Sequence, residues 1–389
     1  MVGGSRDFLS YDGLTLPRRI CYVETQDYAF LTHRKHLGRA ALDLGMEVHV
    51  IAPAGDHVER LRSAGFVFHP LRMKRSGMNP VSESRAIQDL VRIYREVRPH
   101  LAHHVALKAV IYGSAAARIA HVAAVGSITG LGYAFIPGGK RRAVLREAVS
   151  LMLFTALRGR HKHTIFQNPD DQRAFVQKRL VRGNDTSVIY GSGVDTARFA
   201  PTPEPDSVPR VLIATRMLRD KGVVELVDAA RMLRARSVPF ELWLAGDTDA
   251  ENPAAIPATQ LKAWHDEGIV RWLGHAPDIA QLLRDAHIAC LPSYREGLPL
   301  FLAEAAAAGR PAISTDVPGC RAVVQHERTG LLVPARESAS LAAALERLLT
   351  NTPLRKRMGE QARSLALELF SKEQVTGAIL RIYSSLLSS

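Results

Sequence analysis

The chain has 389 residues, of which 47% are hydrophobic and 23% charged, and its formal net charge is +13. This length suits two domains with a core each, and the composition excludes a disordered chain. No apolar run reaches the roughly 18 residues needed to cross a bilayer, and the mixed N-terminal segment does not read as a secretory signal.

Short apolar runs alternate with segments of helical period through the first half. The pattern predicts strands at 19–24, 47–52, 101–104 and 121–125, and helices at 31–44, 90–97 and 109–120. Because strands and helices alternate, we expect parallel sheets covered by helices on both faces.

The second half repeats the scheme. Strands are predicted at 210–214, 240–245, 269–273, 287–291 and 311–314, with helices between them, the first at 222–235. Residues 191–209 are rich in proline and have no periodic pattern, which is typical of an interdomain linker.

The sequence therefore predicts an α/β protein with two doubly wound, Rossmann-like domains. The first spans 18–190. After the linker at 191–209, the second domain spans 210–370. We expect residues 371–389 to form a helix that returns to the first domain. Ligands bind at the carboxyl ends of strands in such sheets, so the active site is expected in the cleft between the domains.

The three cysteines, Cys21, Cys290 and Cys320, lie in or beside apolar runs without metal-ligand spacing. We expect them to be buried thiols rather than ligands or disulfide partners.

The most informative stretch is 292–316, PSYREGLPLFLAEAAAAGRPAISTD. A loop with Glu296 follows a predicted strand, Pro299 can begin a helix, and Gly309 can end it. Free N–H groups and the positive dipole end at the start of such a helix suit a diphosphate. Glu296 is positioned for sugar hydroxyls and Glu304 for a ribose. Either carboxylate alone could simply complement the helix dipole, but the pair around Gly-Leu-Pro is specific.

A second motif is ATRMLRDKG at 214–222, where a predicted strand ends and a helix begins. Arg216 and Lys221 flank this turn. Two cations beside a helix start suit a leaving diphosphate, which gains charge as the sugar bond breaks. By itself, this motif could also be two exposed loop cations on a basic protein.

Together these motifs resemble the retaining glycosyltransferases of family 4. Thr215-Arg216, Lys221-Gly222, Glu296 and Glu304 carry the resemblance, supported by Gly193-Val194-Asp195 and Phe199, and it extends over about residues 18–389. It implies the GT-B fold, in which two Rossmann-like domains face each other across a cleft. In this arrangement the domain at 18–190 would bind the acceptor and face the membrane, and the domain at 210–370 would bind the nucleotide sugar.

The resemblance also implies roles for individual residues. Arg216 and Lys221 would hold the donor diphosphate, and Glu304 the ribose. Glu296, with the backbone of Gly297 and Leu298, would hold the sugar, while Gly246 would lie near the base. The catalytic residues would be Glu296, Arg216 and Lys221, with no cofactor.

The first half narrows the resemblance. FLTHR at 30–34, HHVALK at 103–108, ITGLGYAF at 128–135 and IFQNPDD at 165–171 are similar to enzymes that extend polyprenyl-diphosphate-linked sugars. These enzymes serve capsule, exopolysaccharide, O-antigen and bacterial protein glycosylation. The resemblance implies a nucleotide-sugar donor, expected to carry UDP, a lipid-linked saccharide acceptor, and transfer of a hexose or N-acetylhexosamine.

Two departures from the family pattern affect the first domain. The first loop, 25–30, lacks a glycine pair, and 129–132 reads TGLG where many members have a sugar-binding histidine. The remaining acceptor candidates are His33, His103, His104, Lys108 and Thr129. Histidines outside a recognised motif are more often structural than catalytic.

The excess charge lies in the first half, where residues 1–200 hold 29 Lys and Arg against 16 Asp and Glu, while residues 201–389 hold 22 of each. Segment 140–163 concentrates it among bulky apolar residues. This pattern indicates a helix at an anionic membrane surface, with Arg141, Arg142 and Arg146 at the lipid phosphates. The alternative is a core helix with basic ends. Peripheral attachment to the inner face of the cytoplasmic membrane is expected.

Other functions remain open. A sugar-nucleotide epimerase or hydrolase would have the same two-domain architecture. A non-catalytic nucleotide sensor would have the same nucleotide-binding motifs. A nucleic-acid-binding protein would explain the basic half, but no zinc-finger, helix-turn-helix or stacking signature is present, so no nucleic-acid partner is expected. Asp247 and Asp249 have the spacing of a metal motif, but they follow a strand better suited to the base, so no metal is expected.

Overall fold

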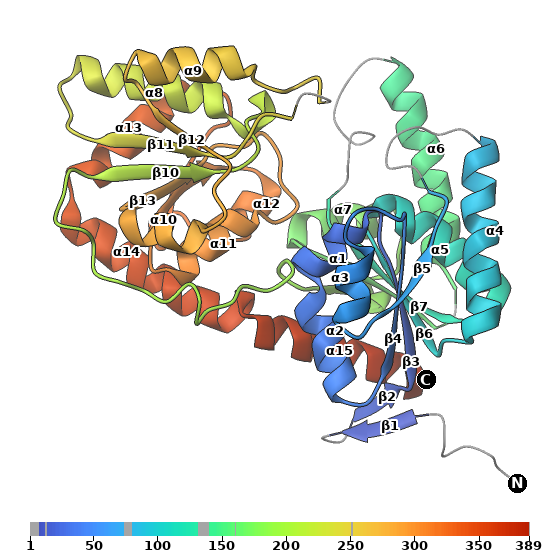
Figure 1. The fold of residues 1–389 in the computed structure, drawn as a ribbon. Coiled ribbons are helices and arrows are strands. Elements are labelled where there is room, and N and C mark those ends of the chain that lie inside the picture. The colour runs from blue at the N-terminus through green and yellow to red at the C-terminus, as the bar shows by residue number, and fades with distance from the viewer. Residues whose placement is uncertain are drawn as a thin grey trace, which may run out of the picture. The chain divides into compact units, whose positions relative to one another are not determined.

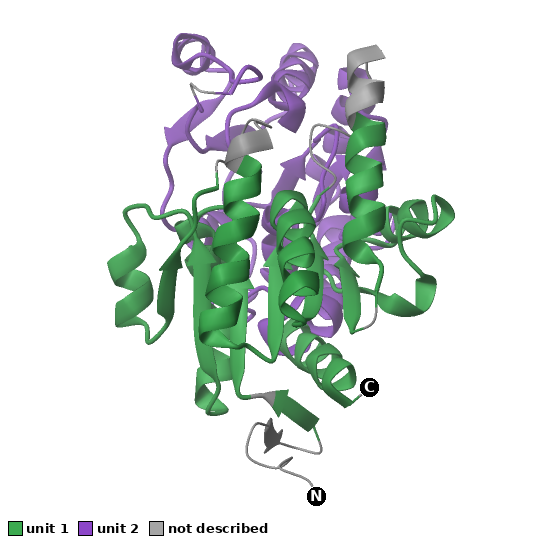
Figure 2. Cartoon of the chain, turned by 90° about the vertical axis from the view of Figure 1, so that its right-hand side faces the viewer, with its two compact units in different colours: residues 1–192, 375–389 green, residues 193–374 purple. Residues whose placement is uncertain are grey.

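The computed structural model describes residues 8–11, 14–73, 80–130, 140–159, 161–249 and 252–388. It consists of two compact units, residues 1–192 with 375–389, and residues 193–374 (Figure 2). Each unit contains a parallel sheet with helices on both faces. The prediction of two doubly wound α/β sheets is confirmed.

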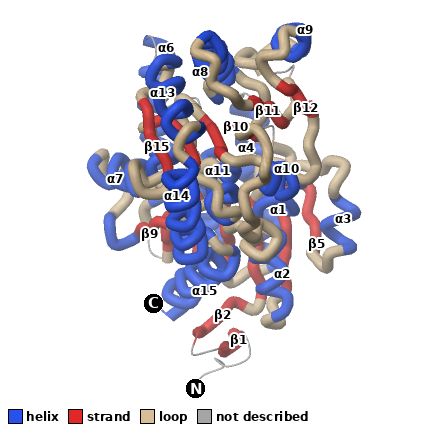
Figure 3. The backbone as a smooth tube through the Cα atoms, turned by 90° about the vertical axis from the view of Figure 1, so that its left-hand side faces the viewer, coloured by secondary structure: helices blue, strands red, loops and turns tan. Residues whose placement is uncertain are grey.

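The first unit is built on a seven-stranded parallel sheet with the order β5-β4-β3-β6-β7-β8-β9. Its strands are β3 (Arg19–Val23), β4 (Glu47–Ala52), β5 (Val67–Pro70), β6 (Leu101–Val105), β7 (Ala123–Ile128), β8 (Lys162–Phe166) and β9 (Thr186–Val188). A separate antiparallel hairpin, β1 (Phe8–Tyr11) and β2 (Leu14–Pro17), precedes it. The hairpin lies beside the end of the last helix (Figure 3), where the Thr15 amide donates to Ser384 Oγ at 3.0 Å.

Side chains of each central strand alternate between two cores of the first unit. In β3, Ile20 and Tyr22 face one core, and Cys21 and Val23 face the other. The first core is covered by α1 (Asp27–His33), α2 (Lys35–Asp43), α3 (Val58–Ser63) and α15 (Lys372–Ser388). The second is covered by α4 (Pro80–Val97) and α5 (Leu107–Ala120), beside which lie α6 (Lys140–Leu157) and α7 (Pro169–Gln177).

The helix predicted at 31–44 is in fact two helices. At Arg34 the backbone takes φ −128° and ψ −5°, outside the helical region. Its N–H still closes α1 by donating to the Phe30 carbonyl, while its own carbonyl accepts from Gly38 in α2. No proline or glycine marks this break, so the sequence pattern does not reveal it.

The second unit is built on a six-stranded parallel sheet with the order β12-β11-β10-β13-β14-β15. Its strands are β10 (Arg210–Ala214), β11 (Glu241–Ala245), β12 (Arg271–Gly274), β13 (Ile288–Leu291), β14 (Ala312–Thr315) and β15 (Gly330–Val333). Strands β13 and β14 are buried along their whole length, as expected for strands covered on both faces.

Helices cover both faces of this second sheet (Figure 1). They are α8 (Val223–Ala235), α9 (Ala258–Asp266), α10 (Ile279–Asp285), α11 (Leu300–Ala307), α12 (Pro318–Arg321), α13 (Ser338–Leu349) and α14 (Thr352–Leu365). Helix α8 packs against α13, and α11 packs against α14. The chain order reverses direction between β10 and β13, and this switch point is where open α/β sheets bind ligands.

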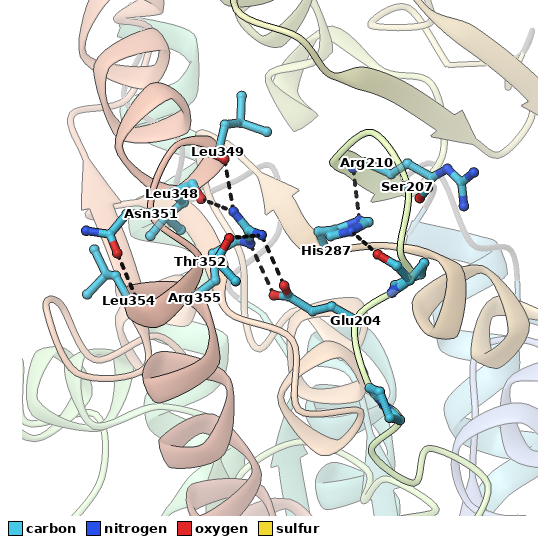
Figure 4. A network of polar contacts seen from close by, with 12 residues as sticks. Glu204, Ser207, Arg210, His287, Leu348, Leu349, Asn351, Thr352, Leu354 and Arg355 are labelled. Carbon is cyan, nitrogen blue, oxygen red and sulfur yellow. Dashed lines mark hydrogen bonds and ion pairs between the residues drawn. The ribbon is translucent and has the colours of Figure 1, made fainter.

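The proline-rich segment 193–209 is fastened to the second unit (Figure 4). Glu204 accepts two hydrogen bonds from the buried guanidinium of Arg355, at 3.1 and 3.0 Å, and Arg355 also donates to two carbonyls of α13. His287 donates to the Pro205 carbonyl at 3.1 Å. Residues 193–209 therefore have a fixed path along the second unit.

Candidate functional site

The two sequence motifs meet at the carboxyl edge of the second sheet. Thr215 and Arg216 follow β10, and the loop 292–299 follows β13, its neighbour across the switch point. The predicted helix is present: α11 begins after Pro299, ends at Ala307, and is followed by Gly309 with φ +69°. Its first amide groups face the loop that precedes it, so the positive end of the helix dipole lies at the same edge of the sheet as Arg216 and Lys221.

A cavity of about 700 Å³ opens at this edge. Three of the predicted donor residues, Arg216, Gly246 and Glu304, line it together. The other lining residues are Ala214, Thr215, Ala245, Asp247, Thr248, Asp249, His275, Ala276, Ile279, Leu300 and Phe301. Apolar walls with a few charged groups are typical of a nucleotide-sized site.

Gly246 brings backbone to the wall of the cavity. Its φ is +134°, and a Cβ atom there would lie 1.9 Å from the Thr215 carbonyl oxygen. Its amide donates to the Gly274 carbonyl at 2.7 Å, and its carbonyl accepts from Trp272 Nε1 at 3.0 Å. Any side chain at position 246 would force apart the ends of β10 and β11.

Glu304 places a carboxyl group in the wall of the cavity. Burial raises its pKa from an ordinary value of 4.5 to about 7, although the positive charges of Arg198 and Lys372 act in the opposite direction. The carboxyl group is therefore divided between its neutral and ionised forms near neutral pH. A donor group from a ligand would favour the ionised form.

Lys221 and Glu296 form an ion pair next to this cavity, although they are not among the residues that line it. Lys221 Nζ lies 2.6 Å from Glu296 Oε1, and the two side chains are only 19% and 12% exposed. Ser293 Oγ also donates to Glu296 Oε1, at 2.7 Å. The carboxylate is thus held by two donors from two different loops.

The backbone at 296 and 297 is supported from behind by α12. A Cβ atom on Gly319 would lie 2.5 Å from the Glu296 carbonyl oxygen and 2.6 Å from that of Gly297. Only glycine permits this approach, so α12 fixes the loop that carries Glu296 and leads through Leu298 into α11.

Arg216 is also paired within the site. Its Nη1 donates to Asp249 Oδ2 at 2.7 Å. Both predicted diphosphate cations, Arg216 and Lys221, therefore contact carboxylates of the chain.

Comparison with known proteins agrees with this geometry. Residues 208–351 match the family described as glycosyl transferases group 1, and residues 19–158 match the glycosyl transferase 4-like family. A curated relative is N,N'-diacetylbacillosaminyl-diphospho-undecaprenol alpha-1,3-N-acetylgalactosaminyltransferase of Campylobacter jejuni. It is 25% identical over 385 residues, which is 95% of this chain and 100% of that protein. The putative glycosyltransferase EpsD of Bacillus subtilis is 29% identical over 52% of this chain and 55% of its own.

Solved structures give the same fold. Sucrose-phosphate synthase from Thermosynechococcus elongatus aligns with a TM-score of 0.79 at 20% identity, covering 95% of this chain and 99% of that one. HepE from Anabaena, in complex with UDP and glucose, aligns with a TM-score of 0.75 at 19% identity, covering 95% and 100%.

The chain is a family 4 glycosyltransferase with the GT-B fold.

In the first unit of this glycosyltransferase, two of the acceptor candidates are inaccessible. His103 and His104 are fully buried. His103 bonds to Tyr383 Oη and Ser127 Oγ, each at 2.6 Å, and His104 Nε2 bonds to Tyr94 Oη at 2.9 Å. Burial lowers the pKa of both histidines, so they are neutral core residues, and the prediction that they contact the acceptor is wrong.

The other three acceptor candidates remain partly exposed. His33 ends α1, and burial together with the charge of Arg34 lowers its pKa to about 4. Lys108, at the start of α5, bonds Glu83 at 2.8 Å. Thr129 directly follows β7. His33 and Lys108 thus lie at helix ends, and Thr129 lies just beyond the carboxyl end of a strand.

Segment 140–163 of the glycosyltransferase contains the whole of α6 and the start of β8. The side chains of Arg141 and Arg142 lie outside the described residues, and Arg146 is 39% exposed beside Glu147. Along the rest of α6, Val149, Leu153 and Leu157 are buried in the core. The apolar side chains on its outer face are Leu151, 66% exposed, and Phe154, 38% exposed. From residue 146 onward, α6 is thus a core helix with the side chains of Leu151 and Phe154 on its outer face.

Within the described part of the chain, no helix is long and apolar enough to span a membrane, and no group of three metal-ligating side chains occurs. Cys21, Cys290 and Cys320 are free and buried, as expected.

Sequence reasoning missed several residues of the site. His275 lines the cavity just after β12, and its position after a strand was an available signal. Ser293 bonds Glu296 from three residues earlier in the same loop, so its position in that loop was also an available signal. Gly319 approaches the loop from α12, and this contact leaves no local pattern in the sequence.

Proposed function

We propose that this glycosyltransferase moves a sugar, with retention of configuration, from a nucleoside diphosphate donor to a saccharide linked to polyprenyl diphosphate. The donor is proposed to carry UDP, and the sugar to be a hexose or N-acetylhexosamine. The observation that supports the donor site best is the cavity where Arg216, Gly246 and Glu304 meet, with Lys221 and Glu296 adjacent.

In this proposal the nucleotide occupies the cavity. The base lies against the Gly246 backbone, whose lack of a side chain leaves room for a flat ring. The ribose hydroxyls donate to Glu304, and the diphosphate lies between Arg216, Lys221 and the start of α11. These groups place positive charge beside the diphosphate oxygens, which become more negative when the bond to the sugar breaks.

Glu296 is proposed to orient the donor sugar by accepting hydrogen bonds from its hydroxyls. Lys221 and Ser293 hold this carboxylate in place, so the orientation costs little reorganisation during the reaction. The acceptor hydroxyl then attacks from the face that the diphosphate leaves. The charge that a divalent ion supplies in other transferases would come here from Arg216, Lys221 and the helix.

For the acceptor, the support comes from the Campylobacter jejuni relative, whose name specifies a diphospho-undecaprenol-linked substrate. We propose His33, Lys108 and Thr129 as residues that contact the acceptor. Synthesis of a surface polysaccharide or glycan is the proposed pathway.

The test is a panel of UDP-, GDP- and ADP-sugars against polyprenyl-diphosphate-linked saccharides. The product is identified by mass and its anomeric configuration by NMR. We expect one sugar to be added, with the configuration of the donor, and Glu296→Gln to lose that product. Release of free sugar, or an epimerised nucleotide sugar, without any extension of the lipid would instead establish the hydrolase or epimerase alternative.

The protein is further proposed to bind the inner face of the cytoplasmic membrane, through Leu151, Phe154 and the basic residues of α6. Apolar side chains insert between lipids while nearby cations contribute about 1 kcal/mol each at an anionic surface. Wild-type protein should sediment with anionic vesicles at low salt. Leu151→Ser with Phe154→Ser should weaken this, whereas Leu367→Ser, at a site 45% exposed in the second unit, should not. Equal sedimentation of all three proteins would exclude this face.

A further inference from the structure

Asp249 has no role in the proposed donor site, yet it contacts one of that site's cations. Its Oδ2 accepts from Arg216 Nη1 at 2.7 Å, and both side chains line the cavity. Arg216 is 50% exposed and Asp249 30% exposed, so the pair faces the space where a diphosphate is proposed to lie.

Backbone hydrogen bonds fix the segment that carries Asp249 opposite Arg216. The Met217 amide donates to the Asp247 carbonyl at 3.0 Å, and the Ile256 amide donates to the Met217 carbonyl at 2.9 Å. Thr248 Oγ1 also donates to the Ile256 carbonyl at 2.7 Å. Because Arg216 and Asp249 lie on segments joined in this way, the ion pair follows from the fold rather than from a chance meeting of two long side chains.

The environment of this pair differs from that of Lys221 and Glu296. Glu296 has a second donor in Ser293 and is 12% exposed, so it is anchored. For Asp249, Arg216 is the side-chain donor that the structure records, and the carboxylate can turn away by a rotation of its own side chain. Of the two carboxylates, Asp249 is the one suited to give way to another anion.

We propose that Asp249 competes with the donor diphosphate for Arg216 and thereby speeds the release of the nucleoside diphosphate product. This inference rests on the proposed function. A diphosphate that approaches Arg216 either displaces the carboxylate or lies beside it as a like charge, and both lower its affinity. When the product leaves, Asp249 takes its place on the guanidinium, so that the cation is never left without a partner.

The test compares wild type, Asp249→Asn and Asp249→Glu, with UDP as the probe. Calorimetry gives Kd and stopped-flow displacement gives the dissociation rate. We expect Asp249→Asn to bind UDP about 3- to 5-fold more tightly, the upper part of the range for one partly exposed ion pair, with most of the change in dissociation. Asp249→Glu, which keeps the charge, should stay within about twofold of wild type.

Asp266→Asn is the matched control, because Asp266 forms an exposed pair with Lys262 on α9 and its loss changes the net charge equally. It should leave UDP affinity unchanged. In an Arg216→Gln background, Asp249→Asn should have a smaller effect than in wild type, since the competition needs the guanidinium.

An Asp249→Asn variant that binds UDP with unchanged or weaker affinity would overturn the inference, and so would the same gain in the Asp266→Asn control. Failure of the proposed function has a different signature. In that case wild-type protein binds none of UDP, GDP or ADP, whatever residue stands at 249.

Discussion

Replacing Glu304 by glutamine should stabilise this glycosyltransferase at alkaline pH. The carboxyl group lies in the wall of the cavity, and burial raises its pKa to about 7 from an ordinary value of 4.5. The folded chain therefore keeps a proton at pH values where the unfolded chain has lost it. Stability from this group is full below pH 4.5, falls as the pH rises through about 7, and is then constant.

The size of the effect follows from the pKa. A difference of one pKa unit corresponds to about 1.4 kcal/mol, so the rise at Glu304 lowers the free energy of unfolding by up to about 3 kcal/mol at pH 8. Glutamine has nearly the same shape and does not ionise, so Glu304→Gln should remove this loss. The gain in thermal midpoint should be several degrees at pH 8 and about zero at pH 4.5.

The assay is the thermal midpoint of wild type and Glu304→Gln from pH 4.5 to pH 8.5, with Glu360→Gln, an exposed carboxyl on α14, as the control. Parallel curves for wild type and Glu304→Gln would refute the reasoning. The same group should couple nucleotide binding to protons. At pH 7, UDP binding to wild type should release part of a proton, seen as a dependence of the calorimetric heat on the buffer, and Glu304→Gln should release none.

Three further predictions follow from the other contacts. Glu296→Gln should lower kcat and kcat/KM together by about 10²-fold and keep UDP affinity within about threefold; equal losses in turnover and UDP affinity would reduce Glu296 to a binding role. Arg216→Ala and Lys221→Ala should each lower kcat/KM by about 10²-fold, and EDTA should leave wild-type activity intact; activity lost to EDTA and restored by manganese would contradict this. Arg355→Met should destabilise the second unit by about 3–5 kcal/mol in urea unfolding, because it leaves Glu204 buried without its partner, and adding Glu204→Leu should restore part of the loss. An unchanged midpoint for Arg355→Met would show that the pair does not hold segment 193–209.

The periodic features of this chain could be predicted well from the sequence. Strands β4 and β10 have the predicted bounds, because short runs rich in Val, Ile and Leu are a strong signal for buried parallel strands. Helix α11 was predicted from Pro299 and Gly309, two residues whose backbone preferences act locally. The turn at 214–222 was predicted in the same way.

What could not be predicted depends on contacts between distant residues. The ion pair of Lys221 with Glu296 joins positions 75 residues apart, and that of Arg216 with Asp249 joins positions 33 apart. Nothing in a local pattern reveals them. The burial of His103 could not be predicted for a related reason, since its partner Tyr383 comes from the far end of the chain. The partner of His104, Tyr94, is only ten residues away, but the two are brought together by the packing of a helix on a strand.

The position of α15 has a consequence for how this protein is made. The helix begins at Lys372 in the second unit, but Val375, Ile379, Tyr383 and Leu386 belong to the core of the first. A ribosome that has released residues 1–192 has therefore made a sheet with one face only partly covered, since α1, α2 and α3 are present and α15 is not. The second unit can fold as soon as it emerges, whereas the first must wait for the final turns of the chain. During synthesis this leaves apolar surface open for the time taken to make about half the protein, which is the interval when a chaperone would be needed. Expression of residues 1–192 alone should for the same reason give an aggregating fragment.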